Sequence, residues 1–325
     1  MAVTTVESRE SWIVASAVLA ITTVAFGCAW ITPVALTEIA NEIGGVRTIP
    51  ALASSIAWLG AGIGGVLMGW MYRRFGARAI VICGSIMLAA GLAVSTLGAS
   101  TPLLVGHGLF IGLLGIGAVN APMYIYISQW FDKRRGSALA LISSGSYLAG
   151  ALWPPVFEKS ISAFGWRQTM LMYGVFVVIV VAAIALVFLK APPESSQGSG
   201  ETAAETPRFQ MRLAPNVAFA LLCAAAVLCC IPMAMPQQHM VAFCGDLGIS
   251  RSTGALLLSV LLGTAFISRQ LGGWASDKLG GLNTIFICSG AQALALTAFL
   301  FTQSEAGLFF VAALFGLGFS PIVPA

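Results

Sequence analysis

Ten apolar segments of about 20 residues or more follow one another along this 325-residue chain, separated by polar connections. A helix crosses about 30 Å of hydrocarbon with about 20 residues, at about 1.5 Å per residue. Helices are favoured there because every backbone polar group must be satisfied without water. The segments therefore predict an all-α polytopic membrane protein. Their approximate limits are residues 12–35, 51–72, 79–98, 102–127, 138–157, 168–190, 213–236, 252–275, 283–302 and 306–325.

Composition excludes a water-soluble domain. Hydrophobic residues make up 58% of the chain and charged residues 9%, and the mean hydropathy is +0.92, so there is too little polar surface to cover a soluble fold. The net charge of +4 is small, and we expect no nucleic-acid partner. The first apolar segment is longer than a signal-peptide core and lacks a clear cleavage site, so we interpret it as a retained transmembrane helix.

The apolar segments hold few groups that could carry catalysis. All twelve acidic residues lie in connections, tails or segment ends, and the seven cysteines form no Cys-x-x-Cys pair. The two histidines, His107 and His239, are far apart in sequence, and His107 fits either a hydrogen-bonded packing residue or a proton relay. We therefore expect no metal site, no cofactor and no enzymatic activity.

A polar stretch at 191–212, rich in Pro, Ser, Gly, Glu and Thr, predicts a flexible linker. It divides the chain into a six-helix part at 1–190 and a four-helix part at 213–325. Eleven of the fifteen Lys and Arg residues in connections and tails fall on one side of the predicted topology. Basic residues are retained in the cytoplasm, so we expect a cytoplasmic N-terminus in a plasma or inner membrane.

Glycines four residues apart occur within the second and fourth segments, as at Gly60 and Gly64 and at Gly108 and Gly112. Lipid supplies no hydrophobic drive for helices to associate. Small residues at this spacing therefore predict closely packed helix backbones.

One loop pattern occurs twice, about two hundred residues apart. The frame Gly-Trp-x-x-(charged)-(basic)-(apolar)-Gly is found at 69–76 and again at 273–280. Such a repeat between membrane-spanning segments predicts a transporter with internal pseudosymmetry. The loop residues that we expect to take part in gating are Gly69, Arg73, Arg74, Gly76, Arg78, Gly273, Asp277, Lys278 and Gly280.

Arg269 is the basic residue expected deep in the membrane, because it lies eight residues, or about 12 Å of helix, before Asp277. A central arginine costs at least about 2.5 to 3.5 kcal/mol on insertion scales and usually faces a cavity with an anionic partner. No acidic residue lies in the middle of any segment, which favours a dissolved anion as that partner. The alternative is that the side chain extends back toward the headgroups.

Four sequence pieces together resemble the major facilitator superfamily, with closest similarity to its branch of oxalate:formate antiporters and monocarboxylate transporters. They are 74–78, 130–136 followed by Ala138, 165–167, and the stretch from Arg269 to Asp277. The resemblance implies that Arg269 binds a substrate carboxylate. It also implies that Tyr124 and Tyr147, with Asn120 nearby, line the cavity.

The chain departs from this family pattern in two places. Arg73 occupies a position that usually carries an acidic or amide residue, so the electrostatic latch of that motif is not expected in its usual form. The family has twelve transmembrane helices, whereas ten are predicted here, so we expect a C-terminally incomplete second half that lacks helices eleven and twelve.

The sequence therefore predicts a major facilitator fold that moves a small organic anion, with a monocarboxylate favoured, by alternating access across the bilayer. A coupling proton or a counter-anion would be a further partner. Two alternatives stay open: a carrier of a neutral or cationic compound, as in efflux, or an inactive truncated fragment or assembly subunit.

Overall fold

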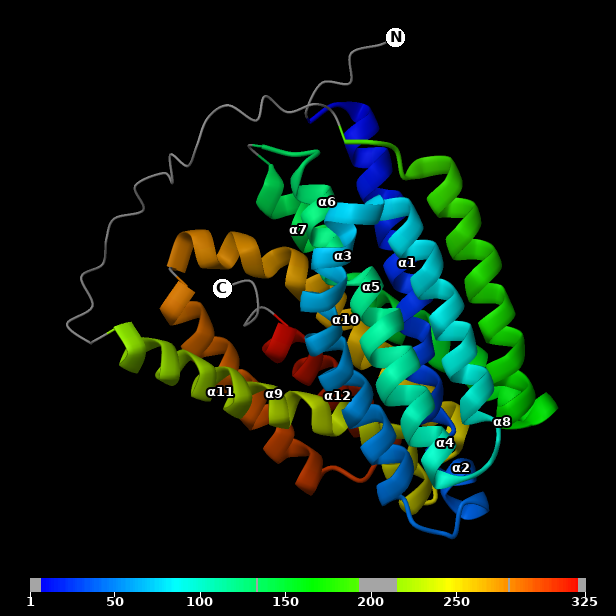
Figure 1. Cartoon of the computed structure of the whole chain (residues 1–325). Helices are drawn as coiled ribbons and strands as arrows, with labels where there is room; N and C mark the ends of the chain where they lie inside the picture. Colours follow the sequence, from blue (N-terminus) through cyan, green and yellow to red (C-terminus); the bar gives the residue numbers. More distant parts are fainter. Residues whose placement is uncertain (1–6, 133, 193–214, 280, 321–325) are drawn as a thin grey trace.

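The computed structural model describes residues 7–132, 134–192, 215–279 and 281–320, with only the backbone described for residues 273–279, 281–282 and several residues in 215–226. All the regular secondary structure of the described residues is helical (Figure 1). In chain order these are α1 (Arg9–Val34), α2 (Leu36–Glu42), α3 (Thr48–Ser95), α4 (Ser100–Val105), the π-helix η1 (Gly106–Ile116), α5 (Gly117–Val119), α6 (Ala121–Ser128), α7 (Arg135–Ser143), α8 (Gly145–Phe188), α9 (Pro215–Asp246), α10 (Arg251–Leu279), α11 (Gly281–Phe301) and α12 (Glu305–Phe319).

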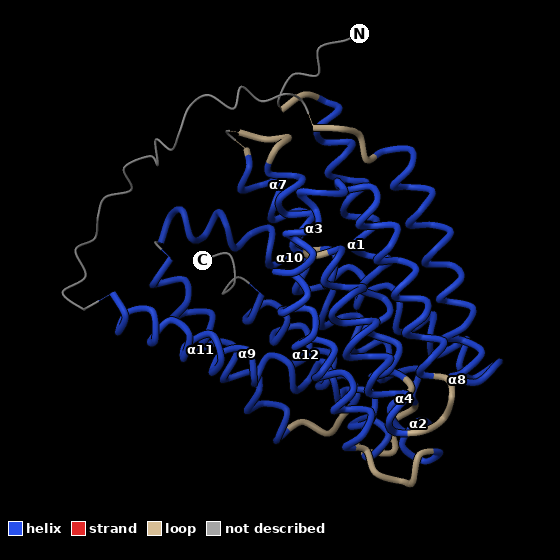
Figure 2. The backbone as a smooth tube through the Cα atoms, in the orientation of Figure 1, coloured by secondary structure: helices blue, strands red, loops and turns tan. Residues whose placement is uncertain are grey.

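Seven helical stretches among the described residues are long and apolar enough to cross a membrane. The two longest, 48 residues at Thr48–Ser95 and 54 residues at Arg135–Phe188, each exceed the length of one crossing by about twofold. A single glycine bends each one, because Gly76 and Gly165 take positive φ angles of 78° and 79°. Each stretch is therefore two helices that meet at the glycine, where the sequence predicts a polar connection (Figure 2).

Closely packed glycines join α3 to η1. A Cβ added to Gly64 would lie 2.0 Å from the Leu113 carbonyl oxygen, and one added to Gly112 would lie 2.3 Å from that of Ala57. No side chain fits between backbones at this distance, which confirms the small-residue packing expected from the sequence.

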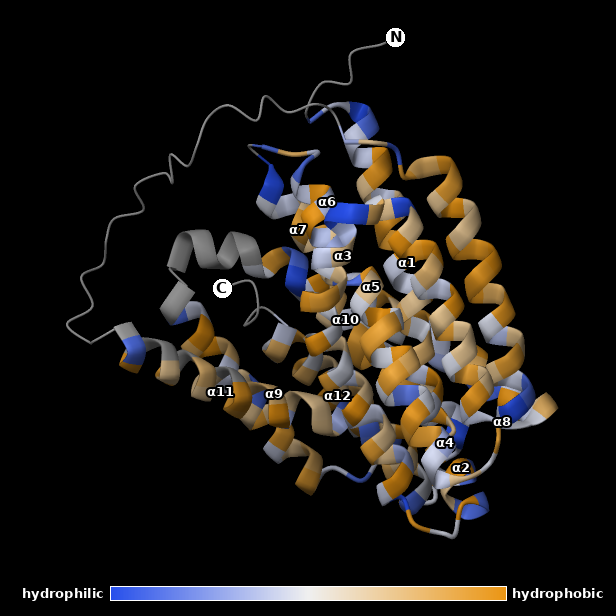
Figure 3. Ribbon diagram, in the orientation of Figure 1, coloured by the Kyte–Doolittle hydropathy of each residue, from blue (hydrophilic) through white to orange (hydrophobic). Residues whose placement is uncertain are grey.

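The outer surface of the bundle is apolar (Figure 3). Large hydrophobic side chains are widely exposed on it, for example Val66 at 81%, Leu228 at 70% and Phe301 at 83%. Such a surface suits lipid rather than water. The fold is thus that of an all-helical, multi-pass membrane protein.

Charged contacts gather at the two ends of the bundle. Near α2, Arg47 pairs with Asp246, Arg167 with Glu42, and Arg251 with Glu38. At the opposite end, Lys190 pairs with Glu10, and the Arg134 backbone N–H donates to the Glu7 carboxylate. Three of the four basic residues predicted to share the outer face, namely Arg47, Arg167 and Arg251, thus lie together. Most of the expected 191–212 linker lies outside the described residues.

Candidate functional site

A cavity of about 120 Å³ lies in the middle of the bundle, walled by helices from both sides of the 191–212 stretch. α1, α3, α6, α7 and α8 contribute most of the wall, and α10 contributes a cation. The lining residues are Thr22, Phe26, Trp58, Asn120, Met123, Tyr124, Ile142, Ser143, Ser146 and Arg269.

Arg269 on α10 supplies that cation. Arg269 is 6% exposed, and its guanidinium lies at the cavity wall rather than at the end of α10. Nη1 donates to the Ser143 carbonyl oxygen at 3.3 Å and Nη2 donates to the Tyr147 hydroxyl at 3.3 Å. The guanidinium carbon also lies 4.6 Å from the centroid of the Tyr147 ring, a cation–π distance. Tyr147 thus holds Arg269 without itself lining the cavity.

A break between α7 and α8 provides the acceptor for Arg269. Ser144, within the run Ser143-Ser144-Gly145-Ser146, ends one helix and begins the next. The Tyr147 N–H donates to the Ser144 carbonyl at 3.1 Å, one residue short of a regular α-helical bond. The Ser143 carbonyl accepts from two side-chain donors, namely Arg269 and the Ser146 hydroxyl.

A second break, at Asn120, faces the same cavity. Asn120 separates α5 from α6 with φ −81° and ψ −86°, and Pro122 at the start of α6 has no N–H to donate. The Asn120 carbonyl accepts from the N–H groups of Met123 and Tyr124 at 3.1 and 3.3 Å. The break turns Asn120 and Tyr124 toward the cavity.

The charge on Arg269 is not neutralised by any described residue. None of the ion pairs among the described side chains includes it, and its Nε is buried with no hydrogen-bond partner. Of the five N–H groups of a guanidinium, the described contacts engage two, both at 3.3 Å. An arginine fork with unused donors therefore borders the central cavity.

The sequence-predicted residues divide between two places. Arg269, Tyr124 and Asn120 line the cavity, and Tyr147 contacts Arg269 from behind. The first copy of the loop pattern lies at one end of the bundle, where Arg73 and Arg74 are exposed and Arg78 donates to the Leu189 carbonyl. In the second copy the described backbone of Gly273, Asp277 and Lys278 is helical, whereas Gly280 lies outside the described residues.

Sequence reasoning missed several lining residues. The run of three serines and a glycine at 143–146 stands out in an apolar segment and could have indicated a helix break. Phe26 and Trp58, whose ring centroids are 5.9 Å apart, carry no comparable signal, because an aromatic residue in a transmembrane helix usually packs or faces lipid. Gln270, which donates to the Ser144 hydroxyl at 2.5 Å, was also missed.

Comparison with known proteins agrees with this architecture. The sequence profile described as Major Facilitator Superfamily matches residues 18–325. This chain belongs to the Major Facilitator Superfamily. Members of this superfamily are in general membrane carriers of small molecules rather than enzymes.

Individual members of the superfamily are distant from this chain. It is 26% identical over 276 residues to MFS-type transporter 1 of Ophiocordyceps sp. (strain BCC 1869), covering 82% of this chain and 60% of that protein. It is 24% identical over 287 residues to the uncharacterized MFS-type transporter YcxA of Bacillus subtilis (strain 168), covering 86% and 69%. The chain spans 55% to 60% of the length of the first three curated relatives.

A solved superfamily structure shares the fold. A bacterial homologue of the human lysosomal transporter Spinster, in an inward-facing and occupied conformation, superposes with a TM-score of 0.65 at 18% identity. The match covers 98% of this chain and 74% of that chain. At this identity the likeness shows the major facilitator fold and no more.

Proposed function

We propose that this protein is a secondary transporter of a small organic anion, and that a monocarboxylate binds at Arg269. The observation that supports the proposal is the buried guanidinium, with unused donors and no described counter-ion, at the wall of a central cavity. A carboxylate presents two oxygens in the plane that matches a guanidinium fork, and such charge-assisted pairs are strong when shielded from water.

The size and charge of the cavity favour one small acid group. Its volume of about 120 Å³ is well below the roughly 300 Å³ at which drug-sized ligand pockets begin. Arg269 is the only basic residue in the described lining, which also contains the aromatic rings of Phe26 and Trp58. A second carboxylate would be desolvated among these rings without a cation to pair with. A compact acid with a short apolar body fits both the charge and the walls.

Besides the cation, the lining has five polar side chains, those of Thr22, Asn120, Tyr124, Ser143 and Ser146. They could hydrogen-bond a hydroxyl or keto oxygen next to the carboxylate. We propose that they distinguish a hydroxy or keto acid from an unsubstituted acid of the same length.

Transport would follow from the position of the site between two groups of helices. Arg269 comes from α10, after the 191–212 stretch, whereas the other lining residues come from helices before it. An anion held between them would contact both groups while they rock about the site. Returning the carrier empty would leave a buried cation without a counter-ion, which is costly. We therefore propose exchange of one anion for another, with proton coupling as the alternative.

A thermal-shift screen of the purified chain tests the substrate class. Ligand that binds only the folded state stabilises it by about 2.7 kcal/mol at one hundred times its Kd. We expect two- to four-carbon monocarboxylates to raise the apparent melting temperature, and dicarboxylates of equal length to raise it less. Stabilisation by neutral or cationic compounds alone would favour the efflux alternative instead.

A further inference from the structure

A groove runs along the outside of the bundle between α1 and the end of α8. Its apolar lining comes chiefly from Ile13, Ala17 and Ala20 on α1 and from Ile184 and Phe188 on α8. The groove arises because small α1 residues face larger α8 side chains. Arg9 and Trp12 line its charged end. A neighbouring hollow shares Arg9, Ile13 and Phe188 with the groove and is lined also by Glu10 and Lys190.

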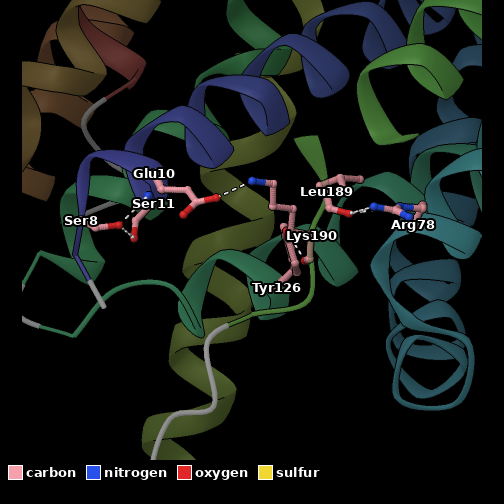
Figure 4. A network of polar contacts seen from close by, with 7 residues as sticks. All are labelled: Ser8, Glu10, Ser11, Arg78, Tyr126, Leu189 and Lys190. Carbon is pink, nitrogen blue, oxygen red and sulfur yellow. Dashed lines mark hydrogen bonds and ion pairs between the residues drawn. The ribbon is translucent and has the colours of Figure 1, made fainter. Parts of the chain in front are cut away.

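The charged end of the groove is held in a fixed geometry (Figure 4). Two N–H groups of Arg78 donate to the Leu189 carbonyl at 3.1 and 2.8 Å, and the Tyr126 hydroxyl donates to the Lys190 carbonyl at 2.7 Å. With its backbone held in this way, Lys190 directs its ammonium at Glu10 on α1, 2.5 Å away.

At the charged end of the groove, Arg9 is exposed and forms no ion pair with any described residue. It is the first residue of α1, where the positive end of the helix dipole disfavours a cation and favours a nearby anion. Glu10, the acidic residue in the lining, is paired with Lys190. The groove therefore ends in a net positive charge.

The length of the groove matches one leaflet. From Arg9 to Ala20 is eleven residues, or about 16 Å along α1, close to half of a hydrocarbon core about 30 Å thick. Trp12 lies within the first turn of α1, beside the charged end, and tryptophan is enriched at membrane interfaces; its ring centroid lies 4.9 Å from that of Phe131. The basic end, the interfacial tryptophan and the apolar remainder thus follow the order of headgroup, glycerol and acyl chain.

We infer that this groove binds an anionic glycerophospholipid of the leaflet at the basic end of the bundle, with its phosphate beside Arg9 and Lys190 and one acyl chain along Ile13, Ala17 and Ala20. Basic sites at helix ends recognise phosphate headgroups by charge. The lipid would fasten α1 to the end of α8, next to the start of the stretch that leads to α9. This site is separate from the Arg269 cavity, and its existence does not depend on the transported compound.

Native mass spectrometry of the delipidated full chain in neutral detergent tests the inference. We expect phosphatidylglycerol to bind at least about fivefold more tightly than phosphatidylcholine with the same acyl chains, since each nearby cation contributes about 1 kcal/mol. Arg9→Gln should lower phosphatidylglycerol affinity about fivefold and leave phosphatidylcholine unchanged. Ala20→Phe should weaken both lipids, because it fills the apolar part of the groove.

Arg135→Gln is the matched control, because Arg135 is an exposed arginine on another helix and does not line the groove. It should bind both lipids as the parent chain does. Equal affinity for the two lipids, an equal effect of Arg9→Gln and Arg135→Gln, or normal binding by Ala20→Phe would each overturn the inference. The melting temperature of every variant is recorded, and Arg9→Gln should melt as the parent does, because the exposed Arg9 side chain forms no ion pair with any described residue.

Discussion

Replacing Arg269 by glutamine separates a binding role from a structural one. Glutamine keeps much of the side-chain length but removes the charge and the planar fork that we propose holds a carboxylate. Hydrogen bonds to charged groups contribute about 1.5 to 3 kcal/mol. We therefore expect anion affinity to fall by roughly 2 kcal/mol, which corresponds to about a thirtyfold rise in Kd.

The empty protein should respond in the opposite sense. Arg269 makes two 3.3 Å hydrogen bonds and leaves Nε buried without a partner, so removing the uncompensated charge relieves a desolvation cost. We expect Arg269→Gln to melt at the same temperature as the parent, or higher, without ligand. Arg269→Lys should recover only part of the affinity, because an ammonium lacks the bidentate fork.

Titration of the purified variants with the best acid from the screen measures both effects. Uptake into proteoliposomes would follow the same order. Lys159→Gln is the control, since Lys159 is exposed and distant in sequence from every lining residue. An Arg269→Gln protein that binds and transports anions like the parent would refute the carboxylate assignment. A large loss of stability without ligand would show that the arginine is structural.

Three further predictions follow from the fold. A reporter fused after Arg135 should report the cytoplasm, and an exterior signal would reverse the predicted topology. Gly64→Ala should lower the free energy of unfolding by about 1 to 3 kcal/mol through overpacking. The control Gly62→Ala should not lower it, because a Cβ added at Gly62 meets open space. Equal melting temperatures for the two variants would contradict the close packing at Gly64. The Arg167 hydrogen bond lowers the pKa of Glu42 below its ordinary value of 4.5. The free energy of unfolding that this pair contributes is therefore fully present above pH 4.5 and is lost as the pH falls through the lowered pKa, and Glu42→Gln should lose this part of the pH dependence.

Much of the fold could be predicted because its constraints are local. Twenty apolar residues must form a helix in lipid whatever they contact, and a basic residue at the midplane must face something polar. Arg269, Tyr124 and Asn120 were placed together by helix position and family resemblance. The eleven-residue π-helix at Gly106–Ile116 was not predicted, since glycine-rich sequence permits a wide turn without requiring one.

The remaining site residues depend on contacts between distant parts of the chain. Phe26 and Trp58 meet because α1 packs against α3, a contact between helices that no local sequence pattern specifies. For His107, the choice between a hydrogen-bonded packing residue and a proton relay also depends on the structure. Its Nδ1 lies 3.0 Å from the Leu103 carbonyl and its Nε2 lies 2.6 Å from the Thr32 hydroxyl. Both ring nitrogens are occupied within the fold, which favours the packing interpretation of this residue.

The ion pairs near α2 have a consequence for which conformation dominates. Two of them, Arg47 with Asp246 and Arg251 with Glu38, join helices from opposite sides of the 191–212 stretch. Half-exposed pairs of this kind contribute about 0.2 to 1 kcal/mol each, so together they could shift a two-state equilibrium by up to about thirtyfold. Dissolved ions screen exposed pairs, so ionic strength should set how long the protein stays closed at the α2 end of the bundle. Salt would therefore change the turnover rate even where its anion does not compete with the substrate for the binding site.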